Sequence, residues 1–222
     1  MTSLDTMERR VLGSLMEKAL SQPDYYPMTV GALVAACNQK SNRDPVMQLE
    51  EDDVDATLKG LRQHRLVTEV LPAPGARAIR YKHEAGGTFA WSKREQAIMT
   101  ELLLRGPQTI GELKTRCARL FPFESTEDVA MTVDAMSTNE TPWVRAMARQ
   151  PGQSTVRYTH LLYPPEEAPA TTPSAPQPAP RMASAPAVAA TSPGLSDEIA
   201  SLREAVARME QRVAALESGT SS

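Results

Sequence analysis

Thr29-Val30-Gly31-Ala32-Leu33-Val34-Ala35-Ala36-Cys37 occurs a second time in this chain, in altered form, as Thr109-Ile110-Gly111-Glu112-Leu113-Lys114-Thr115-Arg116-Cys117. A threonine ahead of an apolar run is typical of a helix N-cap, because its hydroxyl accepts a hydrogen bond from an unpaired amide of the first turn. In the second copy Glu112 adds a capping box. Leu33 and Cys37, like Leu113 and Cys117, recur at the spacing of one helix face. Both copies therefore predict a short amphipathic helix.

The regions around the two copies also resemble each other. An apolar helix is predicted before each copy, over residues 4–20 and from Ser92 onward, and a third helix is predicted after it. Alternating runs at 79–83 and 156–160 each follow a Pro/Gly turn, and another candidate strand precedes each turn, at 66–71 and 144–149. This order is typical of a β-hairpin. The repeated unit is three helices and a hairpin, and the third helices carry the stripes Val54, Leu58, Leu61 and Val129, Val133, Met136.

Three helices followed by a hairpin make a winged-helix unit, with the hairpin as the wing. We predict a mainly α fold with small β-hairpins (α+β), in which residues 1–84 and 92–163 form tandem winged-helix domains. The connection over 38–49 is longer than the three or four residues of an ordinary helix-turn-helix. It is either a loop whose side chains satisfy its own backbone or an interaction loop, and its candidate residues are Asn38, Gln39, Lys40, Asn42 and Arg43.

The composition changes after residue 163. Residues 164–194 include nine prolines and nine alanines, a composition that buries too little apolar surface to offset its ordering entropy, so we predict a disordered linker. Residues 195–217 carry a 3.5-residue apolar repeat, which predicts a C-terminal coiled coil and a parallel homodimer. The alternative is a lone amphipathic helix packed on the body of the protein. The dimerisation residues are Leu195, Ile199, Leu202, Val206, Met209, Val213 and Leu216.

The net charge of −3 arises outside the two predicted domains, because residues 1–163 hold 20 acidic and 20 basic residues. A dedicated DNA-coating protein is usually basic overall, so anion binding here would depend on a local patch. Cys37 and Cys117 occupy equivalent positions of the repeat, and we expect both to be buried thiols in a reducing compartment. No run of eighteen apolar residues and no signal sequence occurs, so we predict a cytoplasmic chain without a membrane segment.

The sequence contains no recognisable catalytic motif. It has no Gly-rich phosphate loop, no Gly-x-Ser-x-Gly elbow and no Cys/His cluster with metal spacing. The three histidines, His64, His83 and His160, lie at the end of a predicted helix and of two predicted hairpins, and the last two are equivalent in the repeat. We therefore predict that the protein is not an enzyme and that it has no cofactor and no metal site.

Three longer stretches resemble a known family. They are Ala36-Cys37-Asn38-Gln39-Lys40-Ser41-Asn42-Arg43-Asp44-Pro45-Val46-Met47, then Leu102-Leu103-Leu104-Arg105-Gly106-Pro107-Gln108-Thr109-Ile110-Gly111-Glu112-Leu113, and Ala148-Arg149-Gln150-Pro151-Gly152 continuing into Arg157-Tyr158-Thr159-His160-Leu161. Together they are similar to the YceH family of uncharacterised bacterial proteins, over nearly all of residues 4–163 and, in outline, the coiled coil. The resemblance implies tandem winged helices and no established activity.

Two functions fit these features. A dimeric DNA-associated regulator would grip phosphates through basic hairpin arms, with salt-sensitive binding. The neutral composition and the acidic run at 50–53, at the start of a helix that would face the duplex, count against it. The alternative is a protein-interaction scaffold that uses the winged helices and the coiled coil. Fold analogy gives a slight preference for duplex DNA, and the candidate nucleic-acid-binding residues are Arg62, Arg65, Arg77, Arg80, Lys82, Arg145, Arg149 and Arg157.

Overall fold

Residues 2–72, 75, 78–149 and 155–169 are described in the computed structural model of the chain, and they belong to one compact unit. The coiled-coil helix predicted at 195–217, with its dimerisation residues, lies outside the described residues. The same holds for the part of the predicted linker that follows Pro169.

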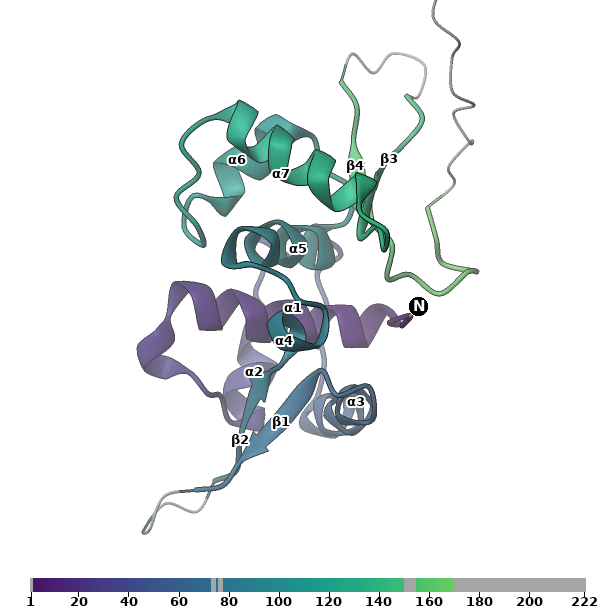
Figure 1. Ribbon diagram of the computed structural model, residues 1–222. Coiled ribbons are helices and arrows are strands. Elements are labelled where there is room, and N and C mark those ends of the chain that lie inside the picture. Colours follow the sequence, from purple (N-terminus) through teal and green to yellow (C-terminus); the bar gives the residue numbers. More distant parts are fainter. Residues whose placement is uncertain (1, 73–74, 76–77, 150–154, 170–222) are drawn as a thin grey trace, which may run out of the picture. The chain divides into compact units, whose positions relative to one another are not determined.

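The first half follows the predicted order. It contains α1 (Thr6–Ser21), the short helix η1 (Pro23–Tyr25), α2 (Val30–Cys37), α3 (Glu51–Gln63) and the antiparallel strands β1 (Val67–Val70) and β2 (Arg80–His83) (Figure 1). Helix α1 begins with a capping box, since the Glu8 amide donates to Asp5 at 2.8 Å and the Asp5 amide donates to Glu8 at 3.0 Å. Helix α3 ends at Gln63, two residues before Arg65, whose left-handed φ of 59° is incompatible with a right-handed helix.

The second half repeats this arrangement. Its elements are α5 (Lys93–Arg105), α6 (Ile110–Cys117), α7 (Thr126–Thr138) and the antiparallel strands β3 (Val144–Ala146) and β4 (Tyr158–His160). The cap predicted at Thr109 is confirmed, and the side chains of Ser92 and Ser125 cap α5 and α7 in the same way. The connection between the two halves contains the one-turn helix α4 (Ala85–Thr88). This helix was not predicted from the sequence. The strands are shorter than predicted, because regular pairing in the second hairpin extends only from Val144–His160 to Ala146–Tyr158.

A matching backbone contact supports the internal repeat. Met28, just before the cap of α2, bridges Tyr81 of the first hairpin, and Gln108, just before the cap of α6, bridges Tyr158 of the second. In each half the segment that leads into the second helix therefore lies along the hairpin. The two copies share tertiary structure as well as sequence.

Helices α1 and α5 pack against each other in the middle of the described unit (Figure 1). Gly13 of α1 permits the close approach, since a Cβ atom at this position would lie 3.0 Å from the Leu104 side chain. Buried apolar residues of both halves form one hydrophobic core, which includes Cys37 and Cys117 as unpaired buried cysteines, as predicted. None of the helices in the described ranges has the length and apolar character needed to cross a membrane.

Candidate functional site

The long loop between α2 and α3 is closed by one asparagine. The Asn38 side-chain amide donates to the Leu49 carbonyl and the Leu49 amide donates back to the Asn38 side-chain oxygen, both at 2.8 Å. Arg10 of α1 donates to the Cys37 carbonyl at 3.0 Å and to the Pro45 carbonyl. The predicted long connection is confirmed, and Asn38 satisfies the loop's own backbone.

Arg43 of this loop points into the protein and is only 4% exposed. Its guanidinium donates to the two carboxylate oxygens of Glu17 at 2.6 and 3.3 Å. Two of its nitrogens also donate to the Ala36 carbonyl in the last turn of α2, at 3.1 and 2.9 Å. One side chain thus compensates a buried carboxylate and satisfies a carbonyl that the end of a helix leaves unpaired.

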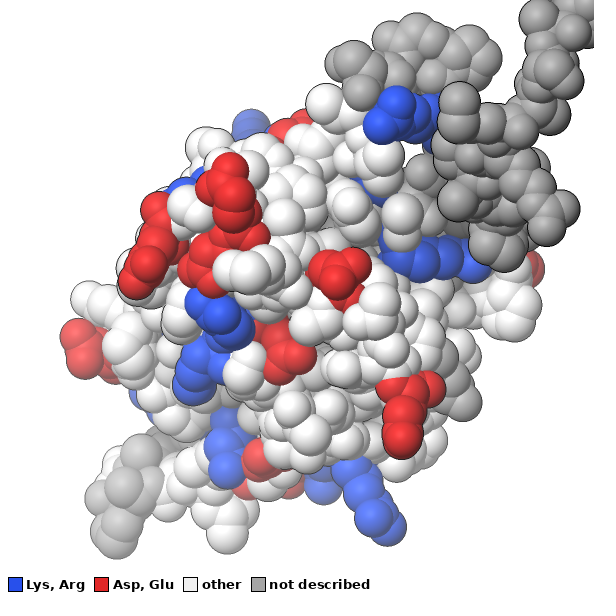
Figure 2. Space-filling view, turned by 45° about the horizontal axis from the view of Figure 1, so that its top comes forward, with Lys and Arg blue, Asp and Glu red and all other residues white. Residues whose placement is uncertain are grey.

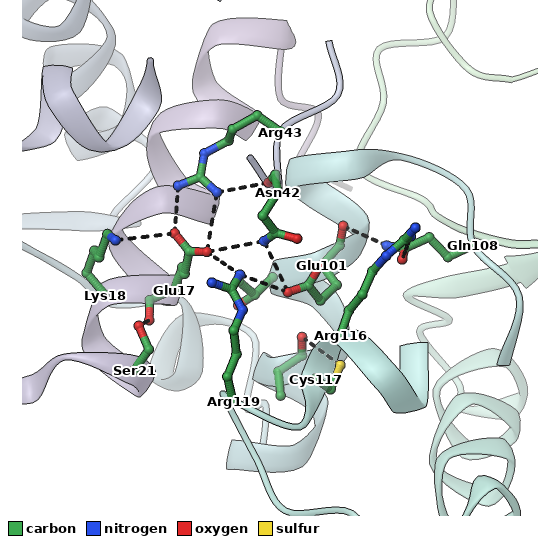
Figure 3. Close-up of polar contacts among 12 residues, drawn as sticks. Glu17, Lys18, Ser21, Asn42, Arg43, Glu101, Gln108, Arg116, Cys117 and Arg119 are labelled. Atoms are coloured by element: carbon green, nitrogen blue, oxygen red, sulfur yellow. Dashed lines mark hydrogen bonds and ion pairs between the residues drawn. The ribbon is translucent and has the colours of Figure 1, made fainter. Parts of the chain in front are cut away.

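Asn42 and Arg119 join Glu17 of α1 to Glu101 of α5 (Figure 3). The Asn42 side-chain nitrogen lies 3.2 Å from Glu17 Oε1 and 3.3 Å from Glu101 Oε1. Arg119, which follows α6, donates to the same two oxygens. Asn42 has a left-handed φ of 56°, which asparagine adopts more readily than most residues. We call Glu17, Asn42, Arg43, Glu101 and Arg119 the polar cluster.

The two carboxyl groups of the polar cluster have opposite pKa shifts. Burial penalises the charge of Glu17, but the hydrogen bond and charge of Arg43, with Arg119, outweigh this penalty and lower its pKa. Burial raises the pKa of Glu101, which Arg119 and Asn42 only partly offset. Glu101 Oε2 has no hydrogen-bond partner among the described residues. Both glutamate side chains are fully buried, whereas the Arg119 side chain is 45% exposed. The hydrogen bonds of the cluster join the two halves.

Sequence reasoning assigned Asn42 and Arg43 to an interaction loop and did not single out Glu17, Glu101 or Arg119. The structure places the first two in the polar cluster, and of the remaining loop candidates Lys40 is exposed. The available signal was a glutamate inside an apolar run of each first helix, such as Glu101 in Ile98-Met99-Thr100-Glu101-Leu102-Leu103. A charged residue at a core-facing position predicts a buried partner.

Several cations predicted to contact DNA face carboxylates. Arg62 pairs with Glu69, and Lys82 lies 2.9 Å from Glu84. In the second half Arg157 lies 2.9 Å from Glu112. Arg157 also donates to a backbone carbonyl ahead of α6, at 2.9 Å. These partners reduce the positive charge that the hairpins present.

Arg80 lines a hollow of about 490 Å³ at the end of α1 and along α2. It donates to the Pro27 carbonyl at 2.8 Å. Lys18, Tyr25 and Gln39 line the same hollow, and Tyr25 is largely exposed. The structure thus brings one hairpin candidate and one loop candidate, Arg80 and Gln39, to a common surface.

The other predicted cations do not form a shared patch. Arg65 and Arg149 are exposed, and neither forms an ion pair with another described residue. Arg145 is half-buried, and its Nε has no partner in the described ranges. Arg77 lies outside the described residues. Figure 2 shows charges of both signs interspersed on the face in view, and some blue and red groups adjoin each other.

The third helices of the two halves are acidic at their starts. Helix α3 follows Glu50 and begins Glu51-Asp52-Asp53. Helix α7, Thr126–Thr138, contains three acidic residues and no lysine or arginine. Its Met131 side chain is 66% exposed. Asp128 is paired with Arg94 of α5 at 2.7 Å, so the exposed surface of α7 combines the carboxylates of Glu127 and Asp134 with the apolar side chain of Met131.

The chain is similar in sequence to several bacterial proteins. The family described as "Protein of unknown function, DUF480" matches residues 4–153. The UPF0502 protein of Koribacter versatilis is 45% identical over 161 residues, which cover 72% of this chain and 74% of that protein. The UPF0502 protein of Geobacter metallireducens is 47% identical over 161 residues, covering 72% and 73%. That of Pectobacterium carotovorum is 42% identical over 165 residues, covering 72% and 77%.

Proposed function

The chain belongs to the DUF480 (UPF0502) family of uncharacterised bacterial proteins, and we propose that it is a non-enzymatic adaptor that binds other proteins through two winged-helix domains. Family membership confirms the resemblance to YceH-like proteins that the sequence motifs indicated. The family carries no assigned activity, so the proposal rests on the surfaces of this chain.

The composition of α7 carries the proposal. In a DNA-binding helix-turn-helix protein the recognition helix enters the major groove with its N-terminal residues against base edges. If α7 had this role, the exposed Glu127 would approach the phosphates, and α7 itself would offer no lysine or arginine to offset its charge. Asp128 is already paired with Arg94 of α5 at 2.7 Å, so Glu127 and Asp134 carry the negative charge of this helix. The exposed Met131 instead provides an apolar, adaptable contact of the kind that suits a protein partner.

The hairpins add to this argument. Binding to DNA gains most of its free energy from cations that replace counterions on phosphates. Arg62, Lys82 and Arg157 each face a carboxylate, so a phosphate would have to compete with that partner. The basic arms are therefore weaker phosphate ligands than the sequence alone suggests.

The absence of catalysis is part of the proposal. The most highly charged constellation in the described part of the chain is the polar cluster, and its two carboxyl groups are buried. A general acid or base must lie within hydrogen-bond reach of a substrate, which these groups do not. Their hydrogen bonds join the two halves instead.

We further propose that residues 195–217 form a parallel dimeric coiled coil. Two copies would then present two sets of winged-helix surfaces at the ends of the Pro/Ala-rich linkers. Such linkage raises the effective concentration of a second binding event without any new contact. This arrangement suits an adaptor that holds two partners or two sites of one partner.

DNA association is a second candidate, which one observation favours. Lys18 and Arg80 meet at the 490 Å³ hollow beside α2, and Arg65 is exposed on the same half. Arg65 and Arg80 are exposed and could contact a phosphate backbone, whereas the Lys18 side chain is only 12% exposed and lies 3.9 Å from Glu17. Asp24 in the same hollow offsets part of their charge.

The experiment that separates the two candidates is fluorescence anisotropy of a labelled mixed-sequence duplex with the full chain, at low and physiological salt. The adaptor proposal expects no binding at either salt concentration. Suppose that the chain binds the duplex with salt-sensitive affinity, that Arg65→Glu/Arg80→Glu abolishes this binding, and that the matched control variant Met131→Asp keeps it. This result would refute the adaptor proposal and support DNA association.

A second experiment looks for the protein partner directly, with a photo-crosslinking residue at position 131. One dominant protein adduct is expected, and unchanged crosslinking after Asp134→Lys and Glu127→Lys would count against an acidic docking face.

A further inference from the structure

We infer that a hollow beside the first turns of α1 binds the carboxylate of a small organic acid, and that Glu167 is an internal anion with which this ligand competes. The hollow has a volume of about 270 Å³. We call it the arginine hollow, and its lining includes Thr6, Arg9, Arg10, Asp44, Met47 and Tyr163. The inference goes beyond the proposed function, and it does not depend on which of the two candidate functions is correct.

Two buried cations line the arginine hollow. Arg9 and Arg10 are consecutive residues of α1, and their exposed fractions are 8% and 2%. Asp44 and Pro45 of the loop after α2 also line the hollow and are exposed, and Thr6 is partly exposed. The arginine hollow therefore opens to solvent and has positive charge on its buried side.

Arg10 has no carboxylate partner in the part of the chain that the structure describes. Its guanidinium donates to the backbone carbonyls of Cys37 and Pro45, and its Nε has no partner there. Burial and the charge of Arg43 lower the pKa of Arg10, and Asp44 raises it by less. A buried cation without an anion is unfavourable, because carbonyl groups replace only part of the lost hydration. Arg10 therefore leaves positive charge at the arginine hollow that an anionic ligand would neutralise.

Arg9 shows how this site holds a carboxylate. Glu167 Oε2 accepts from the Arg9 guanidinium at 2.6 Å and from the Thr6 hydroxyl at 3.0 Å. Arg9 also donates to Thr6 Oγ1 at 2.9 Å. Its guanidinium carbon lies 4.5 Å from the centre of the Tyr163 ring, and that ring stacks on His160 at 3.9 Å. These contacts hold the guanidinium in one orientation, so the donors for a carboxylate are preorganised.

Glu167 is placed as a competitor that a dissolved anion can displace. The segment after β4 returns to the N-terminal end of α1 (Figure 1), where the Leu4 amide donates to the Leu162 carbonyl at 2.8 Å. The Glu167 side chain is 37% exposed. A partly exposed ion pair contributes little to stability, because water competes for its charges. A ligand carboxylate can therefore replace Glu167 at Arg9 and Thr6.

The lining of the arginine hollow selects the kind of anion. Met47 and Leu103 supply apolar surface, against which a short hydrocarbon tail would be buried. Asp44 lines the same hollow, and its carboxylate would repel a second negative charge on the ligand. The volume lies below the about 300–1,000 Å³ that is typical of sites for drug-sized ligands. A monocarboxylate with a short apolar chain therefore fits best.

The test follows methionine signals by NMR, in the full chain with isotope-labelled methionine methyl groups. Met47 lines the arginine hollow, whereas Met131 of α7 is 66% exposed and serves as the reference signal. Met47→Leu and Met131→Leu assign the two signals. The probes are hexanoate, its neutral amide hexanamide, and inorganic phosphate.

The inference predicts a saturable shift of the Met47 signal with hexanoate at millimolar concentrations, and no such shift with hexanamide. Glu167→Gln should tighten hexanoate binding about threefold, because the amide cannot compete as an anion for Arg9. Glu166→Gln is the matched control and should leave the affinity unchanged, since Glu166 is exposed and forms no ion pair with another described residue. Thr6→Val in the Glu167→Gln chain removes one donor to the carboxylate and should weaken binding about threefold.

A Met47 signal that does not respond to hexanoate even in the Glu167→Gln chain would overturn the inference. So would an equal response to hexanamide, or an equal response of Met131, because neither depends on a carboxylate held at the arginine hollow. Equal affinities of the native chain and the Glu167→Gln variant would show that the ligand does not compete with Glu167. Tighter binding of inorganic phosphate than of hexanoate would refute the assignment to a carboxylate.

Discussion

Arg43→Met is the substitution that tests the polar cluster most directly. Methionine keeps much of the side-chain volume and removes all five hydrogen bonds of the guanidinium. Because Arg43 is buried against Glu17, water does not replace the lost partner. The change isolates the charge and hydrogen bonds of one residue.

The expected cost follows from what Arg43 leaves behind. Removing one partner of a buried ion pair costs about 3–5 kcal/mol of stability. Because Arg119 still contacts Glu17 in the variant, we expect a cost at the low end of this range. The Ala36 carbonyl also loses its donors, at about 1–3 kcal/mol. We expect Arg43→Met to lower the free energy of unfolding by about 4 kcal/mol. The double variant Glu17→Leu/Arg43→Met leaves no unpaired buried charge on α1. We expect this double variant to be about 2 kcal/mol more stable than Arg43→Met alone.

Urea unfolding followed by tryptophan fluorescence and far-UV circular dichroism measures these differences, with equal m values as the check that the transitions are comparable. Lys40→Met is the matched control, since Lys40 is exposed in the same loop, and it should change stability by less than about 0.5 kcal/mol. A cost below about 1 kcal/mol for Arg43→Met, or a double variant less stable than the single one, would refute the reasoning.

Three further predictions concern the surroundings of single side chains and glycines. Burial lowers the pKa of His160 from 6.5 to about 3, so the unfolded chain binds a proton that the folded chain does not. The resulting stability is complete above pH 6.5 and falls by about 1.4 kcal/mol per pH unit as pH decreases toward 3; His160→Phe should remove this slope in urea titrations at pH 7 and 5. Gly111→Ala in open space on α6 should stabilise by up to about 1 kcal/mol, whereas Gly13→Ala should gain nothing or destabilise, because its Cβ would lie 3.0 Å from α5. Burial raises the pKa of the Cys37 and Cys117 thiols, so neither should react with Ellman's reagent at pH 8 until urea unfolds the protein.

The elements of the fold were readable from local patterns. Each predicted cap has its own short-range chemistry, as at Asp5, Ser92 and Thr109, where a side chain three residues away completes the motif. The repeat then supplied the order of the helices and hairpins twice. Strand ends were less predictable, because an alternating pattern continues beyond the last paired residue. The helix α4 was missed because its sequence, Ala85–Thr88, has two glycines and too few residues to show a period.

The polar cluster was not predictable in the same way. Arg43 and Asn42 read as part of a polar loop, and polar loops usually lie at the surface. Their burial depends on Glu17, which lies 26 residues from Arg43, and on Arg119, which lies 102 residues from Glu17. No local pattern links such positions. The ion pairs of the hairpin cations were not predictable for the same reason, since Glu112 lies 45 residues from Arg157 and contacts it only in the folded chain.

The repeat is not symmetric where its halves meet, and this bears on function. If the caps Asp5 and Ser92 are taken as equivalent, Glu101 corresponds to Ser14 and Glu17 corresponds to Leu104. The two carboxyl groups of the polar cluster therefore come from non-equivalent positions of α1 and α5, and each half supplies what the other lacks. Because the contacts of the polar cluster are not symmetric, they specify one arrangement of the two halves. In the proposed adaptor, this arrangement would hold α3 and α7 at fixed positions for binding partners.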